Sequence, residues 1–243
     1  MADKERRKEV FVSVSKSGNF LNAAYENYMA EPNKREELPL EIAALHNDGH
    51  IDLVSEFSRL ENTREGSSKF FTTLHIFEKA LPNLIASIRD VMRCVLHLHK
   101  AAGQDMAAGI IFNAYIAHCE KDPTRPLEAM RIIEIEHEQF ADMLPATVAA
   151  GSRANSSHYL SELIRFCQHP APVFRKRAIF SLSSITWPKG ASVPKEALAC
   201  LESAATENED ETLANVITSA FKFYQQDKTT EALVTQGFRT RNA

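Results

Sequence analysis

Apolar residues recur at helical spacing along almost the whole chain, and this pattern stops at glycines and prolines. From Leu81 to Leu96, for example, the apolar positions follow the i, i+3, i+4, i+7 spacing that places side chains on one face of a helix. Seven of the eight glycines stand where such a pattern ends, as glycines do at helix C-termini, and only Gly109 lies inside an apolar run. We therefore predict an all-α protein of eleven or twelve helices joined by short loops.

One short stretch near the N-terminus allows a different interpretation. The residues from Glu9 to Ser15 alternate apolar and polar side chains, as a half-buried strand does. No second stretch of this kind offers a strand to pair with. We therefore favour a helix that carries Val10, Phe11 and Val14 on one face.

Composition narrows the class of protein. The chain has 243 residues, of which 44% are hydrophobic and 25% charged, as in ordinary globular proteins. The N-terminus MADKERRKEV lacks the apolar segment of a secretory signal, and the longest uncharged stretch, Met106 to Cys119, is too short to span a bilayer. The four cysteines lie too far apart in sequence for a metal knuckle, which favours buried, reduced thiols. We expect a cytoplasmic protein that does not enter membranes.

Two successive stretches in the C-terminal half share one design. In Tyr159 to Ile185, two amphipathic helices meet at a short corner that contains prolines, and Asn155 is a candidate cap for the first helix. The stretch Ala197 to Tyr224 repeats this design at an offset of 38 residues, which aligns Arg175 with Leu213. A helical hairpin of this kind cannot bury its apolar faces alone, so we expect the hairpins to stack.

This pair of hairpins resembles the HEAT-repeat family, whose members stack antiparallel helix pairs into curved scaffolds. The resemblance is clearest over residues 159–224, and it implies a short HEAT-like α-solenoid with an N-terminal helical bundle or cap. We accordingly divide the chain into an N-terminal helical region (1–102), HEAT-like repeats (104–236) and a C-terminal tail (237–243).

The resemblance also implies a ladder of polar contacts between repeats. In the family, an aspartate at the hairpin corner commonly pairs with an arginine of the second helix. This chain keeps the arginine as Arg175 in one unit and acids in the corner of the next, at Glu207 and Glu209. We therefore expect one rung, formed by Arg175 with one of these two glutamates.

No motif in the sequence indicates catalysis or a bound cofactor. No two glycines are close enough for a phosphate-binding loop, and there is no G-x-S-x-G nucleophile elbow. His97 and His99 would point about 200° apart on a helix, which separates them as ligands. Cys119 follows His118 directly, but adjacency on a helix does not aim a base at a nucleophile. We predict no catalytic residue, no cofactor and no metal site.

Charged residues around the hairpins are the candidates for contact with a partner. A basic cluster on the second helix of the first hairpin is extended by two neighbouring cations, and an acidic run follows in the next hairpin. The candidate residues are Arg165, Arg175, Lys176, Arg177, Lys189, Glu207, Glu209, Asp210 and Glu211.

We expect these residues to belong to a non-catalytic scaffold, adaptor or regulatory module that binds a protein partner. Two alternatives stay open. A HEAT-like nucleic-acid-binding or DNA-repair enzyme would use the basic strip, although a net charge of −4 disfavours nucleic acid as a partner. A helical metalloprotein would centre on Glu134 and His137, whose spacing is that of one half of a carboxylate-bridged di-iron site. The sequence indicates no oligomeric state.

Overall fold

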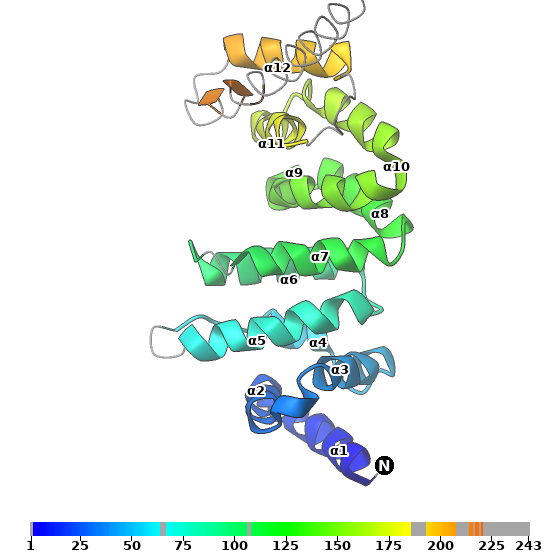
Figure 1. Cartoon of the computed structure of the whole chain (residues 1–243), viewed down its shortest axis with the longest axis vertical. Coiled ribbons are helices and arrows are strands. Elements are labelled where there is room, and N and C mark those ends of the chain that lie inside the picture. Colours follow the sequence, from blue (N-terminus) through cyan, green and yellow to red (C-terminus); the bar gives the residue numbers. More distant parts are fainter. Residues whose placement is uncertain are drawn as a thin grey trace, which may run out of the picture.

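In the computed structural model, the helices follow one another in chain order along the long axis of an elongated molecule (Figure 1). The structure describes residues 2–63, 67–105, 108–185 and 193–207, together with residues 214, 215, 217, 218 and 220. Within these residues every regular element is a helix, so the prediction of an all-α protein is confirmed. The elements are α1 (Ala2–Lys16), α2 (Phe20–Ala30), η1 (Pro32–Lys34), α3 (Glu37–Asn47), α4 (Leu53–Phe57), α5 (Ser67–Ala80), η2 (Leu81–Asn83), α6 (Ile88–Ala102), α7 (Gly109–Glu120), α8 (Thr124–Ile135), α9 (His137–Phe140), η4 (Ala141–Met143), α10 (Leu144–Phe166), α11 (Pro172–Ser183) and α12 (Lys195–Glu207).

The helices pack in two layers. One layer contains α2, α5, α7, the first half of α10 and α11, each of which contacts the next. The other contains α4, α6, α8, the second half of α10 and α12. At the N-terminal end, α1 packs on α2, and α3 packs on α5. The stack continues across the domain boundary that we predict near residue 103, because α6 and α7 pack against each other there.

The alternating stretch near the N-terminus is helical, as we favoured, and it lies within α1. Its apolar residues do not all share one face, however. Phe11 is buried at 1% exposure and packs against Phe20, whereas Val10 is 43% exposed. The expected placement of Val10 is therefore wrong, because only the Phe11 side of α1 meets α2.

Helix α10 is two helices joined without a loop. Asn155, at φ −151° and ψ 79°, breaks the helix, and its Oδ1 accepts a hydrogen bond from the His158 N–H at 3.2 Å. Asn155 therefore caps the second half, as the sequence predicts. We expected Gly151 to end a helix in a left-handed conformation, and this prediction is wrong, because Gly151 lies within α10. It provides space, because a Cβ at this position would overlap the Tyr159 ring.

Side chains from α3 hold the connection between η2 and α6. The Asn47 Nδ2 donates to the Asn83 carbonyl at 2.9 Å, and its Oδ1 accepts from the Ile85 N–H at 2.8 Å. The His46 Nε2 lies 3.2 Å from the Ile85 carbonyl, and its Nδ1 accepts from the Leu53 N–H at 3.2 Å. These bonds replace the partners that an extended connection cannot find within itself.

The same connection is held from the other side by α7 and α8. The His118 Nδ1 donates to the Leu81 carbonyl at 2.9 Å, and the Arg125 guanidinium donates to the Leu84 carbonyl at 3.3 Å and to the His118 carbonyl at 2.7 Å. Three successive parts of the stack are thus joined through one short segment of backbone. We refer to these contacts, made by His46, Asn47, His118 and Arg125, as the backbone clamp.

His118 is the fully buried titratable member of the backbone clamp. Burial disfavours its imidazolium form, and the Arg125 guanidinium 3.1 Å away adds repulsion, so its pKa falls from 6.5 to about 4. The neutral ring can donate from Nδ1 to Leu81. Burying the ring in this orientation leaves its Nε2 without a hydrogen-bond partner, which is energetically unfavourable.

We predict a specific loss of stability in mild acid. The folded-state pKa of His118 lies below its unfolded value, so the unfolded chain takes up this proton first as the pH falls. The contribution is present above about pH 6.5 and is lost as the pH falls towards 4, amounting to about 2 kcal/mol between about pH 7.5 and about pH 5. Urea denaturation at the two pH values should show that His118→Gln lacks this component. An equal pH-dependent loss in wild type and variant would contradict the assignment.

We predict that Gly151→Ala destabilises the chain by roughly 1–3 kcal/mol, because the new methyl group overlaps the Tyr159 ring. Gly109 is the matched control, since a Cβ there meets nothing within 4 Å. Gly109→Ala should leave the free energy of unfolding unchanged or raise it by up to about 1 kcal/mol. Thermal and urea denaturation measure both; equal effects would show that Tyr159 does not need the space at Gly151.

Candidate functional site

Arg165 belongs to an ion-pair network and not to an open basic strip. Its guanidinium nitrogens contact both carboxylate oxygens of Glu134 on α8, at 2.6 and 2.9 Å, and one also contacts Glu162 at 2.6 Å. The hydrogen bond from Arg165 lowers the pKa of the Glu134 carboxyl and keeps it ionised. Arg165 therefore joins the second half of α10 to α8.

The basic cluster on α11 is divided among different contacts. Arg177 forms an ion pair with Asp142 of η4 at 2.6 Å, and Arg175 donates to the His169 carbonyl in the connection between α10 and α11, at 3.0 Å. Lys176 lies between them in sequence and is exposed. Arg165 and Arg177 thus point to partners on different elements, and the structure does not bring them together.

The remaining candidate residues lie outside what the structure describes. This holds for Lys189, Glu209, Asp210 and Glu211, and for the side chain of Glu207 at the end of α12. The expected rung between Arg175 and Glu207 or Glu209 consequently stays a prediction.

The residues considered for a metal have other partners. The Glu134 carboxylate is bound by Arg165, and the His137 ring packs beside the rings of His169 and Phe174. Among the residues that the structure describes, no group of three or more histidine, cysteine, aspartate or glutamate side chains is arranged to hold a metal ion.

The cysteine thiols are free, and three of the four are buried. Burial raises the pKa values of Cys94, Cys119 and Cys167 to about 12, so these thiols are protonated and weakly nucleophilic at neutral pH. Cys200 is partly buried, and burial also raises its pKa.

A groove of about 430 Å³ lies across three consecutive helices of one layer. Its floor is Pro145, Ala146 and Ala149 of α10, and we call it the α10 groove. The walls are Phe112 and Ile116 of α7 and Arg177 and Phe180 of α11, with His99 and Asp142 at the rim. His99 packs on Phe112 with ring centroids 4.8 Å apart, so the rim is continuous with α6.

The α10 groove forms because small residues stand on the middle helix. Pro145 and Ala149 are one turn apart and point outward, whereas the flanking helices carry large side chains at the corresponding places. The position of α10 is set by a buried hydrogen bond between the hydroxyls of Tyr115 and Thr147, 2.8 Å apart. The small side chains of α10 therefore form a recess between the larger side chains of α7 and α11.

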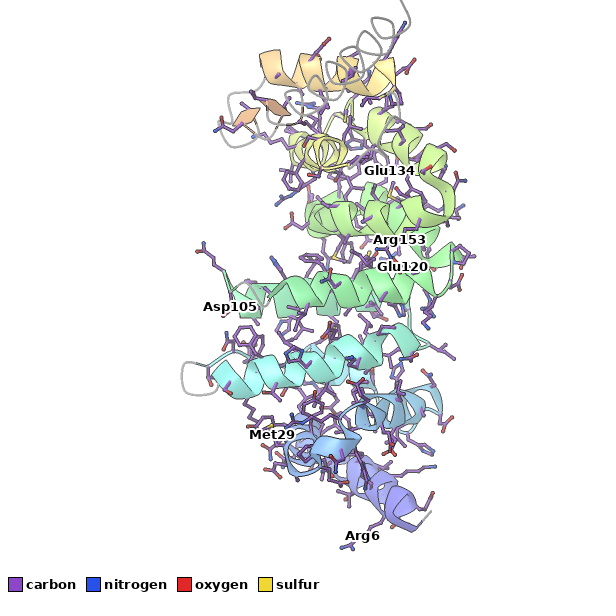
Figure 2. The ribbon with its side chains drawn as sticks, in the orientation of Figure 1. Arg6, Met29, Asp105, Glu120, Glu134 and Arg153 are labelled. Carbon is purple, nitrogen blue, oxygen red and sulfur yellow. The ribbon has the colours of Figure 1, made fainter. Side chains whose placement is uncertain are left out.

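Ion pairs mark the two ends of the α10 groove. Near the start of α10, Arg177 pairs with Asp142. One turn beyond Ala149, Arg153 pairs with Glu120, and Figure 2 shows these two side chains at the same end of α7 and α10. The carbon surface between the pairs faces water, and Phe180 is 36% exposed. Exposed apolar surface enclosed by charges is typical of interaction sites.

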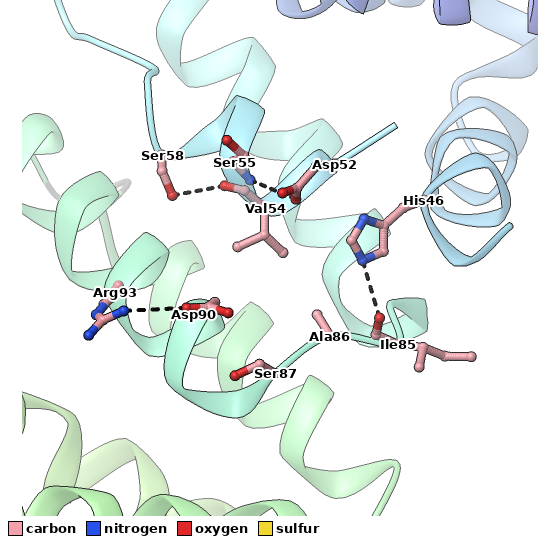
Figure 3. A pocket seen from close by; sticks show the side chains of 10 residues that line it. All are labelled: His46, Asp52, Val54, Ser55, Ser58, Ile85, Ala86, Ser87, Asp90 and Arg93. Atoms are coloured by element: carbon pink, nitrogen blue, oxygen red, sulfur yellow. Dashed lines mark hydrogen bonds and ion pairs between the residues drawn. The ribbon is translucent and has the colours of Figure 1, made fainter. Parts of the chain in front are cut away.

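A second hollow, of about 500 Å³, lies between α3, α4 and α6, and most of the residues that line it have polar side chains (Figure 3). Several of its polar groups already have hydrogen-bond or ion-pair partners within the lining. Ser58 donates to the Val54 carbonyl, and the Ser55 N–H donates to Asp52. Asp90 pairs with Arg93. Binding a ligand there would break existing bonds, so we regard the α10 groove as the candidate site.

The α10 groove was missed by reasoning from charged residues. The signal was present as small outward residues at 145 and 149, with Phe112 one helix earlier and Phe180 one helix later. Arg177 is the single predicted partner-binding residue among its lining residues.

Comparisons of the chain with protein-family models, with curated proteins and with solved structures found no match. In the part of the chain that the structure describes, none of the helices has both the length and the apolar character needed to cross a bilayer.

We predict that the α10 groove binds 1-anilinonaphthalene-8-sulfonate under native conditions. The dye carries an apolar ring system for the floor and a sulfonate for the Arg177 guanidinium, and its fluorescence rises on apolar surface. Ala149→Arg should reduce the enhancement several-fold by filling the floor. Ala44→Arg is the matched control, since Ala44 is an exposed alanine within α3. An undiminished signal in Ala149→Arg would mean that the groove is not accessible.

Proposed function

We propose that this chain is a non-catalytic scaffold or adaptor that binds a protein partner through the α10 groove. The observation that carries the proposal is the water-exposed apolar lining from Phe112 and Ile116 to Phe180. A monomer gains nothing from leaving such carbon surface in a recess, whereas burial against a partner contributes roughly 25 cal/mol per Å² of apolar area.

We further propose that the helices form a short HEAT-like α-solenoid. The order of the helices along the stack supports this, as does the shared use of α10 by two consecutive hairpins. The backbone clamp supports it too, because it joins neighbouring hairpins as a polar ladder would, with histidine and asparagine in place of aspartate. Arg175, which binds the His169 carbonyl, acts within its own hairpin.

The pKa shifts of the buried thiols and of His118 favour binding over catalysis, because each shift makes the group less reactive at neutral pH. The buried thiols have pKa values raised to about 12, and His118 has a pKa lowered to about 4 and uses its Nδ1 to hold Leu81. These shifts follow from burial, which stabilises the neutral forms. Free cysteines also fit a reducing compartment such as the cytoplasm, where we place the protein.

Affinity capture with two variants tests the proposed function. The full-length chain, Ala149→Arg and the control Ala44→Arg are immobilised at equal density, and bound proteins are quantified by mass spectrometry. We expect at least one protein to be retained by wild type and Ala44→Arg and depleted about ten-fold or more by Ala149→Arg, since a buried arginine in the interface costs more than 1.4 kcal/mol. A bound set that is identical across the three baits would contradict a partner site in the α10 groove.

A further inference from the structure

We infer that Cys167 and Cys200 are a redox-sensitive thiol pair, which forms a reversible disulfide between the end of α10 and α12 when the chain meets a small-molecule disulfide. The inference goes beyond the proposed function and does not depend on the α10 groove. It follows from the contact between the two thiols, from their unequal exposure and from the packing of the helices that carry them.

The packing of α12 brings the two cysteines together from separate parts of the chain. In the part of the stack that the structure describes, α12 packs against both α10 and α11 (Figure 1). The buried face of α12 carries Ala197, Leu201 and Ala204. Cys200 is one turn from Ala197, at the edge of that face, and it packs against the core. Cys167 is the residue at which α10 ends, and it is buried. The apolar contacts of α12 therefore place Cys200 beside the end of α10.

The thiols of Cys167 and Cys200 are hydrogen-bonded to each other. The thiols of Cys94 and Cys119 instead bond to hydroxyl groups of other residues. The sulfurs of a disulfide are about 2 Å apart, so this pair has only to close the distance from hydrogen-bond contact to covalent contact. Cys167 stands at a helix end, where the chain opens more readily than in a helix interior. Cys167 and Cys200 are thus the pair that is placed to form a disulfide within one chain.

Exposure and hydrogen bonding give the two sulfurs different roles. Cys200 is partly exposed, whereas Cys167 is only 8% exposed, so an oxidant in solution reaches Cys200 first. Burial raises the pKa of both thiols, to about 12 for Cys167. At Cys200 a hydrogen bond offsets part of this rise, because the Cys167 S–H donates to the Cys200 sulfur and stabilises its thiolate. Cys200 is therefore the attacking thiol, and Cys167 is the resolving thiol.

With oxidised glutathione as the small-molecule disulfide, the reaction takes two exchange steps. The Cys200 thiol loses its proton to water, and the thiolate attacks one glutathione sulfur. The S–S bond of the glutathione breaks, and one glutathione leaves and takes up a proton. The Cys167 thiol then loses its proton and attacks the Cys200 sulfur of the mixed disulfide, which releases the second glutathione as a thiol. Two thiols of the chain are oxidised, and one oxidised glutathione is reduced to two thiols. The second step needs no encounter in solution, because the Cys167 sulfur already lies against the Cys200 sulfur.

Disulfide mapping of the whole chain tests the pair directly. The reduced chain is incubated with oxidised glutathione at about pH 8, where more of each thiol is ionised, and the remaining thiols are blocked with N-ethylmaleimide. Trypsin then places the four cysteines on four different peptides, because lysine or arginine separates each cysteine from the next. We expect mass spectrometry to find the Cys167 peptide linked to the Cys200 peptide at about ten times the amount of any other pair, or more. Absence of this link, equal amounts of all pairs, or a link found only in covalent dimers would each overturn the inference.

Two variants separate the roles of the sulfurs. Cys167→Ala lacks the resolving thiol, so it should retain glutathione on Cys200 as a mixed disulfide. Cys200→Ala should carry about five-fold less glutathione on Cys167 after the same time, because that sulfur is buried. Equal modification of the two variants would contradict the assigned order of attack.

Thermal denaturation measures what the disulfide does to the stack. The bond joins α12 to the end of α10 and closes a loop of about 30 residues, which restricts the unfolded chain. Oxidation should therefore raise the midpoint of the wild-type chain by roughly 5–10 °C and leave that of Cys200→Ala unchanged. Cys94→Ala is the matched control, since Cys94 is a buried cysteine outside the pair, and it should show the same rise as the wild type. A lower midpoint in the oxidised wild type would show that the bond forms only by distorting the packing of α12, which would overturn the inference.

Discussion

The arrangement of the stacked helices depends on side chains that provide hydrogen-bond partners for the backbone groups in the connections between helices. Between η2 and α6, and again after α4, carbonyl and N–H groups leave the helical ladder and lie against side chains of neighbouring helices. Asn47, His118 and Arg125 provide those partners between η2 and α6, and the His97 Nε2 lies 3.0 Å from the Leu60 carbonyl at the preceding corner. Each such bond adds only about 0.5–1.5 kcal/mol, but leaving a buried group unpaired costs more. The bonds are directional, so they set the register of adjacent hairpins in a way that apolar packing alone would not.

Register is also what creates the α10 groove. The Tyr115–Thr147 hydrogen bond joins α10 to α7, and the fit of the Tyr159 ring over Gly151 fixes the angle between the two halves of α10. With α10 in this position, Ala149 lies level with the large residues of α7 and α11, and the recess appears between them. A rotation of α10 by one residue, about 100°, would turn buried Val148 or Ala150 outward and remove the floor. The site is therefore a property of the buried contacts beneath it.

The sequence predicts the helices well because their signals are local. The cap at Asn155 and the periodicity from Ile88 to Leu96 each act within a few residues, and both appear in the structure. The pattern that we predict to begin at Leu81 is wrong before Ile88, because Leu81–Asn83 is a 3-10 helix and the residues from Leu84 to Ser87 are not helical, which leaves Ile85 exposed. The sequence could not predict what the charges would contact. Arg165 meets Glu134, 31 residues away, and Arg177 meets Asp142, because tertiary packing brings together helices that the pattern cannot pair. A groove is harder still to predict, since Phe112, Ala149 and Phe180 form it only after three helices have been aligned.

The break at Asn155 has a mechanical consequence. Two consecutive hairpins share α10, whose two halves meet at Asn155 with no linker between the helix that ends one hairpin and the helix that begins the next. A loop extends under tension by rotating a few dihedral angles, whereas a capped helix junction with the Tyr159 ring seated on Gly151 must lose that contact before it yields. Force applied along the stack would be transmitted through this joint, and the molecule would bend first at the corners on either side of it.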